Sequence, residues 1–166
     1  APYRANLSEI RKGQFEGMAE KIQLEEWAPD FGERRIHPTA GVTAVGARMP
    51  MMAFNVNLDT KDVSVAKKIA KILRYSSGGF QCVKAIGLEY KDMTQVSMDI
   101  TDYTRVPLYR VLEVIRFEAA RYNVHIVNTE LIGACPMMSL IESALYYLQN
   151  DGNFDDKAQI IEYRLM

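Results

Sequence analysis

Cysteine and histidine are scarce in this chain of 166 residues, which contains two of each. Cys82 and Cys135 are not spaced as metal ligands, so a structural zinc site is not expected and no metal is predicted. We expect both cysteines to be buried thiols of a cytosolic protein, and the alternative is a disulfide.

Excess charge and long apolar runs are also lacking. The formal net charge is −1, whereas a nucleic-acid-binding domain usually has a basic surface. No apolar run has the length of a membrane span and no secretory signal opens the chain, so we expect a cytoplasmic protein without nucleic-acid or membrane partners. The chain begins without Met, and a helical pattern starts within its first residues, so we expect it to be part of a larger protein.

The most distinctive stretch is a loop that leads into a strand, from Pro29 to Leu58. Glycine and proline exclude a regular helix in its first part, and arginines with His37 supply cations and donors. Such a loop fits an anionic, partly flat ligand, although a connector with solvated arginines is the alternative. It has neither the Gly-Lys-Ser/Thr ending of a phosphate loop nor the strand that precedes a dinucleotide fingerprint.

Before this loop the sequence predicts only helices with a narrow apolar stripe. Ser8 is expected to cap a short helix, and a second amphipathic helix is expected from Phe15 to Glu26. These helices could not form a core alone.

From Met52 onward the hydrophobic pattern predicts alternating strands and helices. Strands are expected at 52–58, 83–90, 95–102, 124–131 and, as a closing edge, 159–164; helices are expected from Asp59 or Thr60 to Tyr75, from Pro107 to Tyr122 and from Pro136. This order predicts an α/β (α+β) fold, a ferredoxin-like split βαβ sheet with helices on one face. His125 is expected to lie within a buried strand.

The other face of the predicted sheet is polar, with short side chains. By strand parity it carries Asn55, Asn57, Ala85, Gly87, Glu89, Gln95, Ser97, Asp99 and Thr101. Amides, hydroxyls and small residues are suited to the floor of a ligand-binding cleft. The alternative is an ordinary solvated sheet face.

Several motifs in register resemble the formiminotransferase family. The pattern FGxxxxxPxxGxTxxGAR followed by AFNVNL carries the resemblance, together with IRKGQFEGMAEKI, EWAPDFG, VKAIGLEY, TQVSMDITDY, NTELIGACP and IIEY. The resemblance covers essentially the whole chain. It implies transfer of a formimino group from N-formimino-L-glutamate to N5 of tetrahydrofolate, the co-substrate, in histidine degradation, by a homodimeric enzyme.

The resemblance also implies a domain division and a folate site. Residues 1–50 would be the last part of an N-terminal subdomain and residues 51–166 a C-terminal subdomain. The folate-binding segment of the family falls on Gly32, Glu33, Arg34, Arg35, Ile36, His37, Pro38, Thr39, Ala40 and Gly41. Residues of the substrate cleft, expected from strand parity and chemistry, are Arg48, Asn55, Asn57, Gln95, Ser97, Asp99 and Glu130; for Glu130 the alternative is a cap on the following turn.

The general-base histidine of the family has no counterpart here, since neither His37 nor His125 matches it. We therefore expect that histidine upstream of Ala1, and we expect the chain to be inactive alone. Glu33 stands where the family has proline and Val42 where alanine is common; Glu33 adds a negative charge beside the folate segment. Two other hypotheses are a non-catalytic folate-binding or dimerisation module and a related transferase with a different donor.

Overall fold

The computed structural model describes residue 4 and residues 6–165 of the chain. The chain divides into two compact units, Ala1–Ala47 and Arg48–Met166, which are described separately below. None of the helices in the described part is both long and apolar enough to cross a membrane. Cys82 and Cys135 are free thiols and only half-buried, so their predicted burial is not complete.

The first unit contains two short helices and a 3₁₀ turn. They are α1 (Leu7–Ile10), α2 (Gln14–Lys21) and η2 (Glu25–Trp27). The side chain of Asn6, rather than that of Ser8, caps α1 by accepting a hydrogen bond from the backbone N–H of Ser8. The predicted helix to Glu26 is also too long, because Leu24 has an extended backbone that separates α2 from the 3₁₀ turn.

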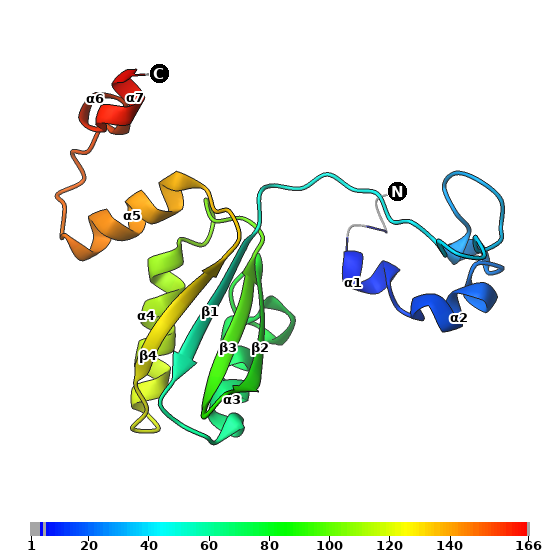
Figure 1. Cartoon of the computed structure of the whole chain (residues 1–166), viewed down its shortest axis with the longest axis horizontal. Coiled ribbons are helices and arrows are strands. Elements are labelled where there is room, and N and C mark those ends of the chain that lie inside the picture. Colours follow the sequence, from blue (N-terminus) through cyan, green and yellow to red (C-terminus); the bar gives the residue numbers. More distant parts are fainter. Residues whose placement is uncertain (1–3, 5, 166) are drawn as a thin grey trace. The chain divides into compact units, whose positions relative to one another are not determined.

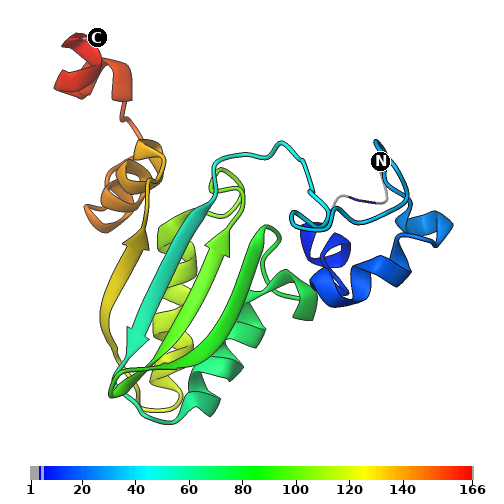
Figure 2. The same cartoon turned by 45° about the vertical axis from the view of Figure 1, so that its right-hand side comes forward.

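The second unit is built on a four-stranded antiparallel sheet in the order β2-β3-β1-β4. Its strands are β1 (Met52–Leu58), β2 (Val83–Tyr90), β3 (Met93–Ile100) and β4 (Ile126–Ile132). Helices α3 (Val63–Leu73) and α4 (Leu108–Ala120) both cover the same face of this sheet (Figures 1 and 2). The predicted α+β class and the order of elements from β1 to β4 are therefore confirmed.

The core lies between this sheet face and the two helices. Phe54, Val56 and Leu58 of β1 are buried at alternate positions, as the sequence predicts for a half-buried strand. Helix α3 buries an apolar stripe that includes Ile69 and Leu73. Twenty buried residues form one continuous hydrophobic cluster here, which is enough apolar surface to stabilise the unit.

The residues directly before α3 and α4 explain where these helices begin. The Oδ1 atom of Asp62 accepts a hydrogen bond of 2.9 Å from the backbone N–H of Ser64, so α3 starts at Val63. The expected cap at Asp59 or Thr60 is wrong, because Asp59 is engaged with His125 instead. Pro107 directly precedes α4, where its fixed φ is compatible with a helix start.

The face assigned to β2 from the sequence is wrong. Ala85 and Gly87 pair with Met98 and Val96 of β3, two core residues, and therefore point toward the helices. A Cβ atom on Gly87 would lie 2.3 Å from the carbonyl carbon of Ala66 in α3. The backbone of α3 therefore leaves no room for a side chain at Gly87, whereas strand parity in the sequence predicts the opposite face for both residues.

The end of the chain is helical and has no fifth strand within the described residues. After α5 (Met137–Tyr147), the chain forms α6 (Asp156–Gln159) and α7 (Ile161–Leu165). Asp155 caps α6 by accepting hydrogen bonds from the backbone N–H groups of Lys157 and Ala158. The predicted edge strand at 159–164 is therefore wrong, because this cap starts a helical turn just before it.

Candidate functional site

The face of the sheet opposite α3 and α4 carries a continuous set of polar side chains. Strands β1, β3 and β4 place Asn55, Asn57, Gln95, Ser97, Asp99, Asn128 and Glu130 on it, as their register shows. β2 adds Lys84, Ile86, Leu88 and Tyr90 in place of the predicted Ala85, Gly87 and Glu89. The sheet face is therefore polar at its centre and partly apolar along β2.

Glu130 lies at the centre of a network of amide side chains. Asn57 Nδ2 donates to Glu130 Oε1 over 3.2 Å, while Asn55 Nδ2 and Gln95 Nε2 donate to Oε2 over 3.4 and 3.3 Å. Asn57 also donates to Asn128 Oδ1 over 2.7 Å. We refer to Glu130 with Asn55, Asn57, Gln95 and Asn128 as the Glu130 cluster.

The Glu130 cluster is built into the sheet. Asn57 is 1% exposed and Gln95 is 4% exposed, and Gln95 Nε2 also donates to Asn57 Oδ1 over 2.8 Å. Buried amides that are hydrogen-bonded to one another have little freedom to reorient. They therefore hold the half-buried carboxylate of Glu130 in a fixed position on the face.

The Glu130 cluster also favours a negative charge. Hydrogen bonds from Asn57, and then from Asn55 and Tyr90, lower the pKa of Glu130, while desolvation opposes the effect and nearby Lys91 adds to it. Donors that stabilise the ionised form of a carboxyl group have this effect in general. Glu130 is therefore an anion at neutral pH.

The sequence predicted most of this cluster. Asn55, Asn57, Gln95 and Glu130 are brought together, and Ser97 and Asp99 lie on the same face, where Ser97 pairs with Asn55 and Asp99 pairs with Lys84. Asn128 was missed, although its alternation with Glu130 in β4 was available as a signal. Arg48 is exposed and lies before the sheet begins.

The predicted folate segment, Gly32–Gly41, lies in the first unit and is largely exposed. Arg34 forms an ion pair with Glu25, and Arg35 forms one with Glu33 over 2.6 Å. Both arginines therefore have carboxylate partners within their own unit. The charge of Glu33 is offset by Arg35.

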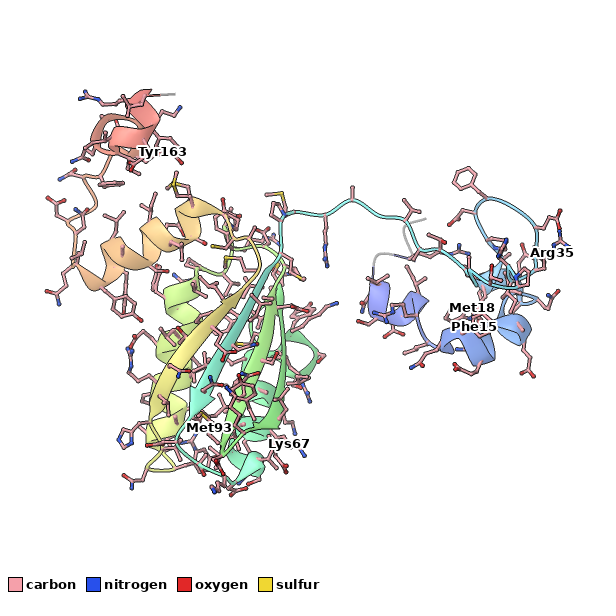
Figure 3. The ribbon with its side chains drawn as sticks, in the orientation of Figure 1. Phe15, Met18, Arg35, Lys67, Met93 and Tyr163 are labelled. Carbon is pink, nitrogen blue, oxygen red and sulfur yellow. The ribbon has the colours of Figure 1, made fainter. Side chains whose placement is uncertain are left out.

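The second half of this segment forms a small closed turn. His37 and Gly41 exchange two backbone hydrogen bonds of 2.9 Å, and the Nδ1 atom of His37 accepts from the backbone N–H groups of Thr39 and Ala40. Gly41 has a positive φ of 65°, and a Cβ atom there would lie 3.1 Å from the ring of Phe15. Figure 3 shows Phe15 and Met18 on α2 and Arg35 on the loop of this unit.

Asp59, directly after β1, and His125, directly before β4, form an acid–base pair. Asp59 Oδ1 accepts a bond of 2.6 Å from the backbone N–H of His125, and Asp59 Oδ2 lies 3.2 Å from its Nδ1. The hydrogen bond from the His125 backbone is the main reason that the pKa of Asp59 is lowered. The His125 side chain is 74% exposed, so its predicted burial is wrong.

Two hollows in the second unit lie along helices α4 and α5. One of about 410 Å³ is lined by residues of α4 and α5, including Phe117 and the stacked rings of Tyr109 and Tyr146, whose centroids are 4.2 Å apart. None of the predicted site residues lines it. Among the described residues, no three His, Cys, Asp or Glu side chains are grouped so that they could hold a metal ion.

Comparison with known proteins gives consistent matches along the whole chain. The sequence model of the Formiminotransferase domain matches residues 53–165, and that of the Formiminotransferase domain, N-terminal subdomain, matches residues 1–48. The chain is 55% identical over 167 residues to glutamate formimidoyltransferase of Streptococcus pyogenes serotype M1, covering 99% of this chain and 56% of that protein.

Two further relatives agree with this match. The glutamate formimidoyltransferase of Thermoplasma acidophilum is 41% identical over 168 residues, covering 99% of this chain and 54% of that protein. The formimidoyltransferase-cyclodeaminase of Mus musculus is 36% identical over 162 residues, covering 92% of this chain and 30% of that protein. The chain spans about half the length of the glutamate formimidoyltransferases that it matches. It belongs to the formiminotransferase family.

Proposed function

We propose that the chain is part of a glutamate formimidoyltransferase. The observation that carries this proposal is the 55% identity to the S. pyogenes enzyme across 99% of the chain. In this function, a formimino group passes from N-formimino-L-glutamate to N5 of tetrahydrofolate in histidine degradation. The boundary between the matched family segments, close to residue 50, supports the two subdomains proposed here, 1–50 and 51–166.

The proposed reaction is addition followed by elimination. The N5 nitrogen of tetrahydrofolate attacks the carbon of the formimino group, and a tetrahedral intermediate forms. The bond between that carbon and the glutamate nitrogen then breaks. The proton lost from N5 is balanced by the proton gained on the glutamate nitrogen, so the products are glutamate and 5-formiminotetrahydrofolate.

Within this chain we assign binding and positioning roles only. The segment Gly32–Gly41 is proposed to bind folate, with Arg34, Arg35 and Arg48 near anionic groups. This assignment requires Arg34 and Arg35 to exchange or share their present carboxylate partners, Glu25 and Glu33. The polar sheet face, with Asn55, Asn57, Gln95, Ser97, Asp99 and Glu130, is proposed as the substrate floor.

Proton transfer needs a base, and we assign that role to neither histidine of the chain. Nδ1 of His37 accepts hydrogen bonds from its own turn, and His125 is paired with Asp59. We propose that the base comes from a part of the enzyme outside these 166 residues. A missing general base typically costs about 10²–10⁴ in rate.

The test is an assay of glutamate release from N-formimino-L-glutamate in the presence of tetrahydrofolate. The chain is assayed alone and mixed with the N-terminal part of the S. pyogenes relative. We expect no turnover alone and tetrahydrofolate-dependent turnover in the mixture. Folate binding without turnover in both samples would favour a non-catalytic binding module, and turnover with another donor but not with formiminoglutamate would favour a related transferase.

The family also leads us to propose a homodimer. Sedimentation equilibrium of the same mixture tests this, since a dimer doubles the mass of one complete assembly.

A further inference from the structure

Glu130 is a fixed, half-buried carboxylate without a cationic partner in ion-pair contact. The ion pairs among the described residues involve other carboxylates. Charged side chains that are partly buried are usually paired. Glu130 is instead held by neutral donors, the amides and the hydroxyl of Tyr90, while Lys91 is nearby without an ion-pair contact to it. Its charge is therefore available to a ligand.

The hydrogen bonds that Glu130 accepts from the amides are long. The three amide donors lie 3.2–3.4 Å from its oxygens, whereas N–H···O bonds in proteins are commonly about 2.9–3.0 Å and those between ions are shorter still. A cationic N–H group could therefore make a stronger bond to Glu130 than these three amides do. The amides fix the position of the carboxylate without saturating it.

The two oxygens of a carboxylate match a planar group that presents two parallel N–H bonds. This bidentate geometry explains the selectivity of carboxylates for guanidinium groups. An amidinium group presents the same pair of parallel N–H bonds along its planar N–C–N edge. We propose that Glu130 binds such a planar N–C–N edge of a substrate. This inference rests on the proposed function, which offers two sources of that edge: the formimino group of N-formimino-L-glutamate and the 2-amino–N3 edge of the pterin.

The proposal can be tested on the chain itself by NMR. The side-chain NH₂ signals of Asn55, Asn57 and Gln95 report directly on the environment of Glu130. The ¹⁵N-labelled chain is titrated with formamidinium and, as a control of equal charge, with methylammonium. We expect formamidinium to shift these signals and to bind at least about tenfold more tightly than methylammonium, because only formamidinium offers two parallel donors.

Two variants separate Glu130 from general negative charge. Glu130→Gln should weaken formamidinium binding at least about tenfold. Glu89→Gln removes an exposed carboxylate of β2 whose side chain has the opposite parity to that of the polar face, and it should bind formamidinium as the unmodified chain does. If Glu130→Gln does not fold, a pH titration of the unmodified chain replaces it, since binding must be lost as Glu130 is protonated.

Further titrations identify which substrate group supplies the planar N–C–N edge. A Glu130-dependent shift with N-formimino-L-glutamate assigns the formimino group, and one with 5-formyltetrahydrofolate alone assigns the pterin. Equal binding of methylammonium and formamidinium, unchanged binding in Glu130→Gln, or no shift with any of these compounds would overturn the proposal. Turnover in the mixed assay together with one of these results would overturn the role of Glu130 only, whereas Glu130-dependent binding without turnover would overturn the proposed function.

Discussion

The two units of this chain are stabilised in different ways. Among the described residues of the first unit, Ile22 is the one fully buried apolar side chain, and ion pairs such as Arg34–Glu25 and Arg35–Glu33 are largely exposed. The second unit has a continuous core of twenty buried residues. Exposed ion pairs contribute little to stability, whereas buried apolar area contributes most of it.

This difference also separates two kinds of ligand surface. The predicted folate segment is an exposed loop shaped by its own backbone hydrogen bonds, whereas the Glu130 cluster is attached to three paired strands. Loops open at lower free energy than core strands. We therefore expect the sheet face to be preorganised and the loop to adjust on binding.

The largest expected effect is the loss of a core side chain in the second unit. Ile69→Ala should lower the free energy of unfolding by about 2–5 kcal/mol, because a fully buried side chain is removed and a cavity remains. Urea denaturation measures this. Ile72→Ala, on the same helix but 40% exposed, is the matched control and should cost less. Similar losses in both variants would contradict the assigned core.

A glycine-to-alanine change should have opposite effects in the two units. In Gly87→Ala the new methyl group meets the backbone of α3, and overpacking of this kind typically costs about 1–3 kcal/mol. In Gly17→Ala the new methyl group has no neighbour within 4 Å, and alanine favours helix α2 by about 1 kcal/mol. Urea denaturation measures the effect of Gly87→Ala on the second unit, and the helical circular dichroism signal of the chain measures the effect of Gly17→Ala. If Gly87→Ala left the free energy of unfolding unchanged, α3 would have to lie farther from β2.

The Glu130 cluster predicts a smaller, pH-dependent effect. Because hydrogen bonds led by that from Asn57 lower the pKa of Glu130 in the folded state, its ionised form stabilises the fold. This stabilisation is complete above the pKa of the unfolded chain, about 4.3, and is lost as the pH falls through the lower pKa of the folded state. The difference in unfolding free energy between the unmodified chain and Glu130→Gln should therefore shrink from about pH 6 to about pH 3. A difference independent of pH would contradict the role of the charge.

The smallest effect is expected for the exposed ion pair of the first unit. Arg35 and Glu33 have side chains that are 77% and 74% exposed, so Arg35→Ala should change stability by less than about 1 kcal/mol. Thermal unfolding followed by circular dichroism measures this at low and at high salt. A larger loss that disappears in salt would show that electrostatic pairing, and not backbone hydrogen bonding, holds the loop.

Errors in the predicted elements have local physical causes. The cap of α3 was placed at Asp59 or Thr60, but Asp59 bonds to His125, which is 66 residues away. Asp62, which could cap equally well, begins the helix. Likewise residues 159–164, after a polar turn, are expected to form an edge strand, but Asp155 starts helical turns there. Such choices depend on partners that sequence spacing does not show.

The sequence by itself determined the family, the α+β class and most of the Glu130 cluster. The family follows from motifs that match in register. The fold class and the cluster follow from the alternation of apolar with polar residues in β1 and β3, because side chains alternate strictly between the two faces of a strand. The tertiary structure alone decided which face of β2 is inward. In the sequence Ala85 and Gly87 resemble part of the polar face, yet their pairing with Met98 and Val96 of β3 places them on the core face. There the backbone of α3 leaves no room for a Cβ atom on Gly87.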